Sequence, residues 1–238
     1  MIQKCLFLLL ALVFSNVVNA QYHVLNKGVA GNNSSDLLRR FDRDVISEKP
    51  NLVILMVGTN DMLNSQKLVS YGQFEENIRT IVNRLKEHNI DIVIMSPPQV
   101  DTGYVLKRHN RNLYQVDLNT KIDSAGRIIN RVAKDFELHF IDLNALFKAY
   151  DSPNRAVSSL ILNQANSGKE DGIHPTKVGY KLVSKTIYDY LSENKLLNNT
   201  KIICFGDSIT YGSYMDGAGT SEGDTYLVVL KRLINHRD

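Results

Sequence analysis

The sequence predicts an α/β fold in which a parallel sheet is covered by helices on both faces. Segments of strand length alternate with segments whose apolar residues recur at helical spacing. The strand segments are apolar throughout, which is typical of strands buried on both faces. The chain has 238 residues, of which 43% are hydrophobic and 22% are charged, so it is long enough to form such a domain around a globular core.

Residues 1–20 have the features of a secretory signal peptide. Lys4 provides the positive charge, residues 6–14 form the apolar centre, and residues 18–20 (Val-Asn-Ala) fit the small-residue cleavage pattern. We therefore expect a secreted or periplasmic protein.

A membrane-spanning anchor is the alternative for the same segment. It is disfavoured because the apolar centre is short and is interrupted by Ser15 and Asn16. We expect cleavage before Gln21, no stable membrane anchor, and a single domain over residues 21–238.

The first elements of the mature chain are predicted to be a short strand over residues 22–25 and, after a loop, a helix. Residues 34–36 are Ser, Ser and Asp, which commonly cap a helix N-terminus. Apolar residues then recur at helical spacing as far as Ile46. Pro50 ends this strand–helix unit.

The middle of the chain repeats the order of strand and helix. The apolar run over residues 52–57 predicts a strand covered on both faces, and residues 74–85 have the pattern of an amphipathic helix. Residues 90–95 form another apolar strand, which stops at Pro97-Pro98. A long helical pattern then runs from about residue 110 to residue 137.

The last third of the chain predicts two further strands and two helices. Residues 140–143 form a short strand, and the polar stretch over residues 144–176 is irregular and long for a connection. A helix over residues 178–191 precedes an apolar, β-branched strand that starts at Lys201. Residues 226–234 close the chain as a helix.

Four polar motifs lie just after predicted strands or just before a predicted helix. Parallel sheets bind ligands beyond the carboxyl ends of their strands, and the N-terminus of the helix that follows the third motif belongs at the same edge. We therefore expect the four motifs to converge; they are residues 28–32, 58–61, 171–174 and 206–208.

Three side chains in these motifs suit acyl transfer. Ser208 lies on a tight turn just beyond a buried strand, where a nucleophile can be both exposed and fixed. His174 can accept its proton, because the reference imidazole pKa of about 6.5 suits proton transfer near neutrality. Asp171, three residues before His174, can accept a hydrogen bond from Nδ1 and so fix the tautomer.

The same motifs contain donors for a tetrahedral oxyanion. These donors are the side-chain amide of Asn60 and the backbone N–H groups of Gly31 and Ser208. Loss of one such donor typically costs about 3–4 kcal/mol of transition-state stabilisation. Glycine at position 31 also lets the backbone approach a substrate closely.

Each motif also has a structural interpretation. His174 could be a surface-loop histidine, Asp171-Gly172 is a common turn, and Asn60-Asp61 could only cap the next segment. Asp207 adjoins the nucleophile, and we interpret it as structural, with its carboxylate accepting from local backbone N–H groups to hold the turn.

Other classes of function have little support in the sequence. A net charge of +3 without a dense basic patch does not indicate nucleic-acid binding. The other five histidines lack acidic or metal-ligand spacing, so we expect them at the surface or in structural positions. Residues 216–224 lack the regular acidic spacing of a calcium loop. We expect no metal and no cofactor.

Together these residues resemble the four sequence blocks of the SGNH (GDSL-type) esterase and lipase superfamily. Residues 206–210 resemble the block with the nucleophile, and residues 26–31 resemble the block with the oxyanion glycine. Residues 58–61 resemble the block with the oxyanion asparagine, and residues 171–175 resemble the block with the acid–base pair. The resemblance covers nearly the whole mature chain. It implies a three-layer, flavodoxin-like α/β/α sandwich with about five parallel strands, a Ser208–His174–Asp171 triad, and an oxyanion hole formed by Ser208, Gly31 and Asn60.

The order of the blocks departs from the family. The serine block comes first in the family and last here, in residues 201–238. Reading from Lys201 to Asp238 and continuing at Gln21 restores the usual order, so the chain resembles a circular permutant. Domain termini often lie close together, and surface joints tolerate permutation.

The resemblance implies a serine ester hydrolase that acts through an acyl-enzyme. We expect it to remove O-acetyl groups from a small-molecule or polysaccharide carbohydrate, because an exported enzyme without an apolar lid suits a small acyl group on a polar substrate. A lysophospholipase or thioesterase is one alternative, and a catalytically silent carbohydrate-binding protein is another. The sequence identifies no protein partner.

Overall fold

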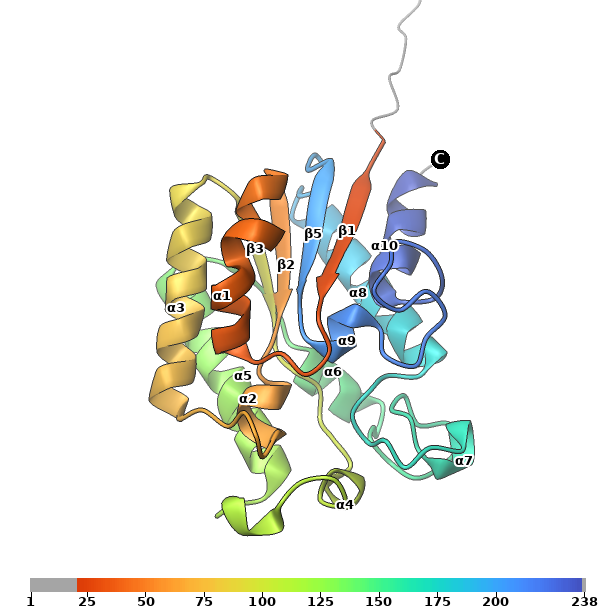
Figure 1. The fold of residues 1–238 in the computed structure, drawn as a ribbon. Coiled ribbons are helices and arrows are strands. Elements are labelled where there is room, and N and C mark those ends of the chain that lie inside the picture. Colours follow the sequence, from red (N-terminus) through yellow and green to blue (C-terminus); the bar gives the residue numbers. More distant parts are fainter. Residues whose placement is uncertain (1–20, 237–238) are drawn as a thin grey trace, which may run out of the picture.

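The computed structural model describes residues 21–236, so the expected signal peptide over residues 1–20 lies outside the described residues. Five strands form one sheet with the order β1-β5-β2-β3-β4, and every neighbouring pair is parallel. The strands are β1 (His23–Gly28), β2 (Leu52–Met56), β3 (Asp91–Met95), β4 (His139–Ile141) and β5 (Lys201–Gly206). The last strand of the chain is therefore inserted between the first two (Figure 1).

The described helices connect these strands or follow them. In chain order they are α1 (Ser34–Asp44), α2 (Thr59–Leu63), α3 (Tyr71–Glu87), α4 (Thr102–Val105), α5 (Leu118–Asp135), α6 (Leu143–Ala149), α7 (Gln164–Ser167), α8 (Lys177–Glu193), α9 (Ser208–Tyr211) and α10 (Tyr226–Asn235), with 3-10 turns η1 (Ile46–Glu48) and η2 (Arg111–Leu113).

Helices cover both faces of the sheet and make three layers. Helices α1, α3 and α5 lie on one face, and α8 and α10 lie on the other (Figure 1). Successive residues of β5 alternate between the two cores: Ile203 and Phe205 belong to one, and Ile202 and Cys204 to the other. Each fully buried Ile or Phe side chain contributes roughly 1.5–3 kcal/mol through loss of apolar contact with water. The predicted parallel α/β/α sandwich is confirmed.

Some helix ends differ from the sequence predictions. The N-cap of α1 is Asn33 rather than a residue of the 34–36 run, because its side chain accepts from the amide of Asp36 at 3.0 Å while the Asp36 carboxylate accepts from the amide of Asn33 at 3.1 Å. The helix predicted from residue 110 begins only at Leu118. Asp117 caps it by accepting from the amide of Asn119 at 2.8 Å.

The polar stretch over residues 144–176 is less irregular than predicted. It contains most of α6 and all of α7, and residues Ile161 and Pro175 form an isolated antiparallel bridge. Asp142, which the sequence pattern places in the preceding strand, instead caps α6 by accepting from the amide of Ala145 at 3.0 Å.

The two ends of the described chain lie side by side. The amide of Tyr22 donates to the side chain of Asn235 at 3.0 Å, and α10 packs beside β1 (Figure 1). Within residues 21–236, no helix combines the length and the apolar character that crossing a membrane requires.

Candidate active site

All four polar motifs meet at the carboxyl edge of the sheet. Ser208 starts α9 directly after β5, Asn60 lies in α2 after β2, and Gly31 lies in the loop after β1. Asp171 and His174 precede α8. These five residues line a single cavity of about 440 Å³. The predicted convergence of the motifs is therefore found in the structure.

Ser208, His174 and Asp171 form a continuous chain of hydrogen bonds. The Oγ atom of Ser208 lies 2.9 Å from Nε2 of His174, and Nδ1 of His174 lies 2.9 and 3.0 Å from the two carboxylate oxygens of Asp171. A carboxylate at Nδ1 holds the ring proton on that nitrogen, which leaves Nε2 free to accept from the hydroxyl group. The geometry is that of a nucleophile, a base and an orienting acid.

The environment of Asp171 keeps its carboxylate ionised. Burial raises its pKa, but hydrogen bonds from the His174 ring and from the amides of His174 and Ile173 outweigh burial and place the pKa below its usual value. The guanidinium of Arg108 also donates to the backbone carbonyl of Asp171 at 2.6 Å, which fixes this loop.

The turn that presents Ser208 contains a buried carboxylate, Asp207, whose two oxygens differ in their hydrogen bonding. One oxygen of Asp207 accepts from the amide of Ile209 at 2.9 Å, as expected for a residue that holds the turn. The other oxygen is buried and has no partner within the described residues. Burial raises the pKa of Asp207 to about 6.

The candidate oxyanion donors lie around the same cavity. In the part of the chain that the structure describes, neither the backbone N–H of Gly31 nor that of Ser208 has an acceptor. The Asn60 side-chain amide donates to the backbone carbonyl of Asn32 at 3.0 Å, which leaves its second N–H for a ligand. Gly31 has φ +75°, a conformation that glycine adopts without strain, and a Cβ there would meet nothing within 4 Å.

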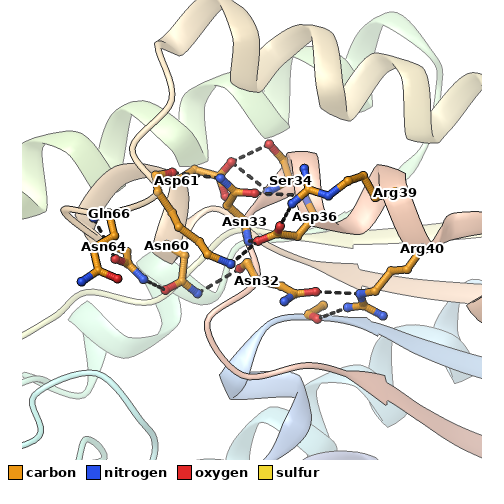
Figure 2. A network of polar contacts seen from close by, with 12 residues as sticks. Asn32, Asn33, Ser34, Asp36, Arg39, Arg40, Asn60, Asp61, Asn64 and Gln66 are labelled. Atoms are coloured by element: carbon orange, nitrogen blue, oxygen red, sulfur yellow. Dashed lines mark hydrogen bonds and ion pairs between the residues drawn. The ribbon is translucent and has the colours of Figure 1, made fainter.

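A buried carboxylate beside Asn60 ties α2 to α1. Asp61 accepts from the Ser34 amide at 2.9 Å and from the Ser34 hydroxyl group (Figure 2). Asn77 donates to that hydroxyl at 2.8 Å. Burial raises the pKa of Asp61 to about 6, although the bonds from Ser34 oppose that shift. Asp61 therefore holds in place the helix that carries Asn60, a role beyond the local capping considered from sequence.

Three further residues line the cavity although no sequence pattern predicts that they lie there. The ring of Tyr214 packs edge-to-face on His174 at 5.3 Å between centroids, and Arg108 and His109 also line the cavity. Burial, followed by the charge of Arg108, lowers the pKa of His109. From the sequence we expect His109 only at the surface or in a structural position, whereas the structure places it in the lining of the cavity. The loop that holds His109 has no regular sequence pattern from which this position could be predicted.

The described part of the chain offers no evident metal centre. Across residues 21–236, no group of three or more His, Cys, Asp or Glu side chains is placed to hold a metal ion. Cys204 is buried in β5, and burial raises the pKa of its thiol to about 12, so this cysteine has none of the features of a nucleophile.

Known proteins of similar sequence include an acetylxylan esterase and a lipoprotein. The chain is 25% identical over 169 residues to an acetylxylan esterase of Geobacillus stearothermophilus, covering 68% of each chain. It is 24% identical over 177 residues to the uncharacterized lipoprotein YqeF of Bacillus subtilis (strain 168), covering 70% of this chain and 72% of that protein.

Solved structures share the fold. The acetyl xylan esterase AlAXEase matches with a TM-score of 0.58 at 23% identity, covering 71% of this chain and 81% of that one. The lipase/acylhydrolase of Enterococcus faecalis matches with a TM-score of 0.55 at 22% identity, covering 69% and 72%. The GDSL-like Lipase/Acylhydrolase family matches residues 11–182, which is most of the chain. The chain therefore belongs to the GDSL-like lipase/acylhydrolase family and is a carboxylic ester hydrolase.

Proposed function

We propose that this protein removes O-acetyl groups from carbohydrates through an acyl-enzyme formed on Ser208. The observation that carries the proposal is the 2.9 Å contact between Ser208 Oγ and His174 Nε2 inside a cavity that Gly31 and Asn60 also line. Asp171 completes the triad as the residue that orients His174.

The acylation half of the reaction follows from this arrangement. His174 Nε2 accepts the Ser208 proton as Oγ attacks the ester carbonyl carbon, and the π electron pair of the carbonyl moves onto its oxygen. The N–H groups of Gly31, Ser208 and Asn60 donate to that oxyanion. The tetrahedral intermediate then collapses and breaks its bond between the carbonyl carbon and the sugar oxygen. The sugar oxygen leaves with the proton from His174.

Deacylation repeats these steps with water. His174 accepts a proton as water attacks the acetyl carbonyl, and the second tetrahedral intermediate expels Ser208 Oγ, which recovers the proton. The products are acetate and the free sugar hydroxyl. Asp171 stays ionised throughout and stabilises the imidazolium.

Two observations support the acetyl group and the carbohydrate. The relatives named above include acetylxylan esterases. The cavity of about 440 Å³ is small, and the polar side chains of Arg108, His109 and Ser213 are among those that line it.

A longer acyl group is the second candidate, and one feature favours it. A second cavity of about 610 Å³ shares Tyr214 with the first and includes the apolar side chains of Leu162, Val178 and Met215. A lysophospholipase or thioesterase substrate would extend its chain into that space.

Export and permutation belong to the same proposal. Cleavage of the predicted signal peptide would release a single domain over residues 21–238 into the periplasm or the medium, and the match to a lipoprotein supports export. A circular permutation is supported by the interior position of β5 between β1 and β2, by the contact between Tyr22 and Asn235, and by a family match that ends at residue 182, before the serine strand.

Hydrolysis of p-nitrophenyl esters from acetate to octanoate tests the proposal. We expect the chain from Gln21 onward to act best on acetate, and Ser208→Ala to lower kcat/KM by roughly 10³-fold or more while remaining folded. Activity that rises with acyl length would favour the second candidate. A Ser208→Ala variant as active as the wild type would overturn the mechanism.

A further inference from the structure

Arg40 is a buried cation whose side chain binds four acceptors at once. It is 7% exposed and lies in α1. Its Nη2 donates to the carbonyl of Gly206 at 2.7 Å, its Nη1 to the carbonyl of Lys27 at 2.9 Å and to the Asp44 carboxylate at 2.7 Å, and its Nε to Oδ1 of Asn32 at 2.7 Å. Only one of these four acceptors carries a charge, so pairing with Asp44 does not account for the site.

The uncharged acceptors belong to the two segments that frame the candidate oxyanion hole. Gly206 is two residues before Ser208, and Asn32 directly follows Gly31. The last backbone bond between these segments joins the amide of Val29 to the carbonyl of Gly206 at 3.1 Å. Beyond that point the two loops leave the sheet, and the guanidinium of Arg40 joins the same Gly206 carbonyl to the Asn32 side chain.

Arg40 is connected to the third oxyanion donor, Asn60, through Asn32. Arg40 fixes the Asn32 side chain, and the backbone carbonyl of the same residue accepts from the Asn60 side-chain amide at 3.0 Å (Figure 2). One guanidinium group is therefore connected to the side chain of the residue that follows Gly31, to the carbonyl of the residue two before Ser208 and, through one further bond, to Asn60. Arg40 itself does not line the cavity.

We propose that Arg40 is a positioning residue that sets the three oxyanion donors relative to one another; this inference rests on the proposed function. A planar fork with five N–H groups can reach acceptors in three directions, whereas the single ammonium of lysine cannot. Catalysis by oxyanion donors depends on their placement before the reaction, and an error of about 1 Å can cost roughly 10²-fold in rate.

The competing explanation is that Arg40 only tethers α1 to the sheet. Its guanidinium also lies 4.6 Å from the centre of the Phe205 ring, a contact that stabilises packing. A tether would affect the free energy of unfolding but not the rate of each folded molecule. The two explanations therefore separate when kinetics and stability are measured on the same variants.

The test compares Arg40→Lys and Asn32→Ala with the control Arg43→Met. Asn32→Ala removes one acceptor of Arg40 and leaves the ion pair with Asp44 intact. Arg43 is exposed on the same helix and donates to the same Asp44 carboxylate at 2.7 Å, but it contacts neither loop of the site. Kinetics use p-nitrophenyl acetate, and thermal unfolding gives the folded fraction.

The inhibition constant of a transition-state mimic provides a measurement that would not change if Arg40 only tethered α1 to the sheet. Phenylboronic acid becomes tetrahedral when serine Oγ adds to boron, so its inhibition constant reports on the oxyanion donors. We expect kcat to fall roughly 10–100-fold in Arg40→Lys and Asn32→Ala, with KM within about threefold and the inhibition constant weakened in parallel. Arg43→Met should stay within about twofold of the wild type in each quantity.

The proposal is overturned if both site variants keep the kcat and the boronate affinity of the wild type per folded molecule, whatever their melting temperatures. If Arg40→Lys does not fold, Asn32→Ala decides the question alone. Failure of the proposed function looks different, because the wild-type chain itself would then hydrolyse no ester.

Discussion

Gly28 and Gly206 face each other as the last paired residues of β1 and β5, and neither position has room for a side chain. A Cβ on Gly28 would lie 2.1 Å from the amide nitrogen of Tyr211, and one on Gly206 would lie 2.3 Å from the carbonyl oxygen of Met56. Both obstacles are backbone atoms, which cannot rotate away. The close approach of Gly28 to α9, the helix that begins at Ser208, brings the loop of Gly31 beside the turn of Ser208.

Gly206→Ala should therefore destabilise the fold. We expect a loss of roughly 1–3 kcal/mol in the free energy of unfolding measured in urea, because the added methyl group must displace backbone. Gly72→Ala is the matched control: Gly72 is exposed in α3, and a Cβ there meets nothing within 4 Å. That change should stabilise the helix by up to about 1 kcal/mol. Equal stability of Gly206→Ala and the wild type would contradict the steric account.

Asp171→Asn should abolish most of the activity without unfolding the protein. The asparagine oxygen can still accept from the amides of Ile173 and His174, but its NH₂ group cannot accept the Nδ1 proton. The ring then holds its proton on Nε2, which can no longer accept from Ser208.

We expect kcat on the acetate ester to fall by roughly 10³–10⁴-fold at neutral pH. Glu170→Gln is the control, since it removes a neighbouring exposed carboxylate that pairs with Lys107. It should change kcat by less than about threefold. A drop of similar size in both variants would indicate a general electrostatic effect instead of a tautomer effect.

Asn60→Ala should lower kcat with little change in KM. Its side-chain amide is proposed to donate to the oxyanion, which exists in the transition state and not in the substrate, and the expected loss is roughly 10²–10³-fold. Asn64→Ala serves as the control because Asn64 donates to Oδ1 of Asn60 at 3.3 Å and does not line the cavity. A rise in KM with unchanged kcat would assign Asn60 to substrate binding instead.

Sequence patterns predicted the elements whose signal is local. The strands at residues 52–57 and from Lys201 are apolar throughout, and the turn after each carries the polar residue that reaches the cavity. The helix pattern from residue 110 was misleading, because an N-cap at Asp117 decides where α5 begins. Side-chain capping bonds compete with apolar periodicity, and the spacing of apolar residues does not reveal which of them prevails.

Site residues could be predicted only where their chemistry is explicit in a motif. Ser208, His174 and Asp171 lie on turns whose position beside the strands follows from the alternation of elements. Arg40 could not be found in this way, because two of its acceptors are backbone carbonyls of strands that lie 13 and 166 residues away. Tyr214 lies in a loop without regular pattern, so its contact with His174 also depends on the tertiary fold.

Asp207 makes the free energy of unfolding fall as pH rises, whereas an ion-paired carboxylate makes it increase with pH. Its pKa is about 6 in the folded protein, compared with 3.8 for the free side chain. Below both values the group is neutral in each state. As pH rises from about 4 to about 6 the unfolded chain ionises first, so the free energy of unfolding falls; above about 6 the loss is constant. The difference between the two pKa values corresponds to at most about 3 kcal/mol.

Asp207→Asn should remove this pH dependence. The amide oxygen can still accept from the Ile209 amide, and the NH₂ group replaces the oxygen that has no partner. The stability of the variant relative to the wild type, measured by urea unfolding from pH 4 to pH 8, should therefore increase with pH up to about pH 6 and then level off. Carboxylates that do not interact with Asp207 cancel in this difference. The control Asp42→Asn alters an exposed ion pair with Arg84 and should shift stability by less than about 1 kcal/mol. A relative stability of Asp207→Asn that is flat or decreasing with pH would show that Asp207 is ionised in the fold at low pH, and that an unseen partner satisfies its second oxygen.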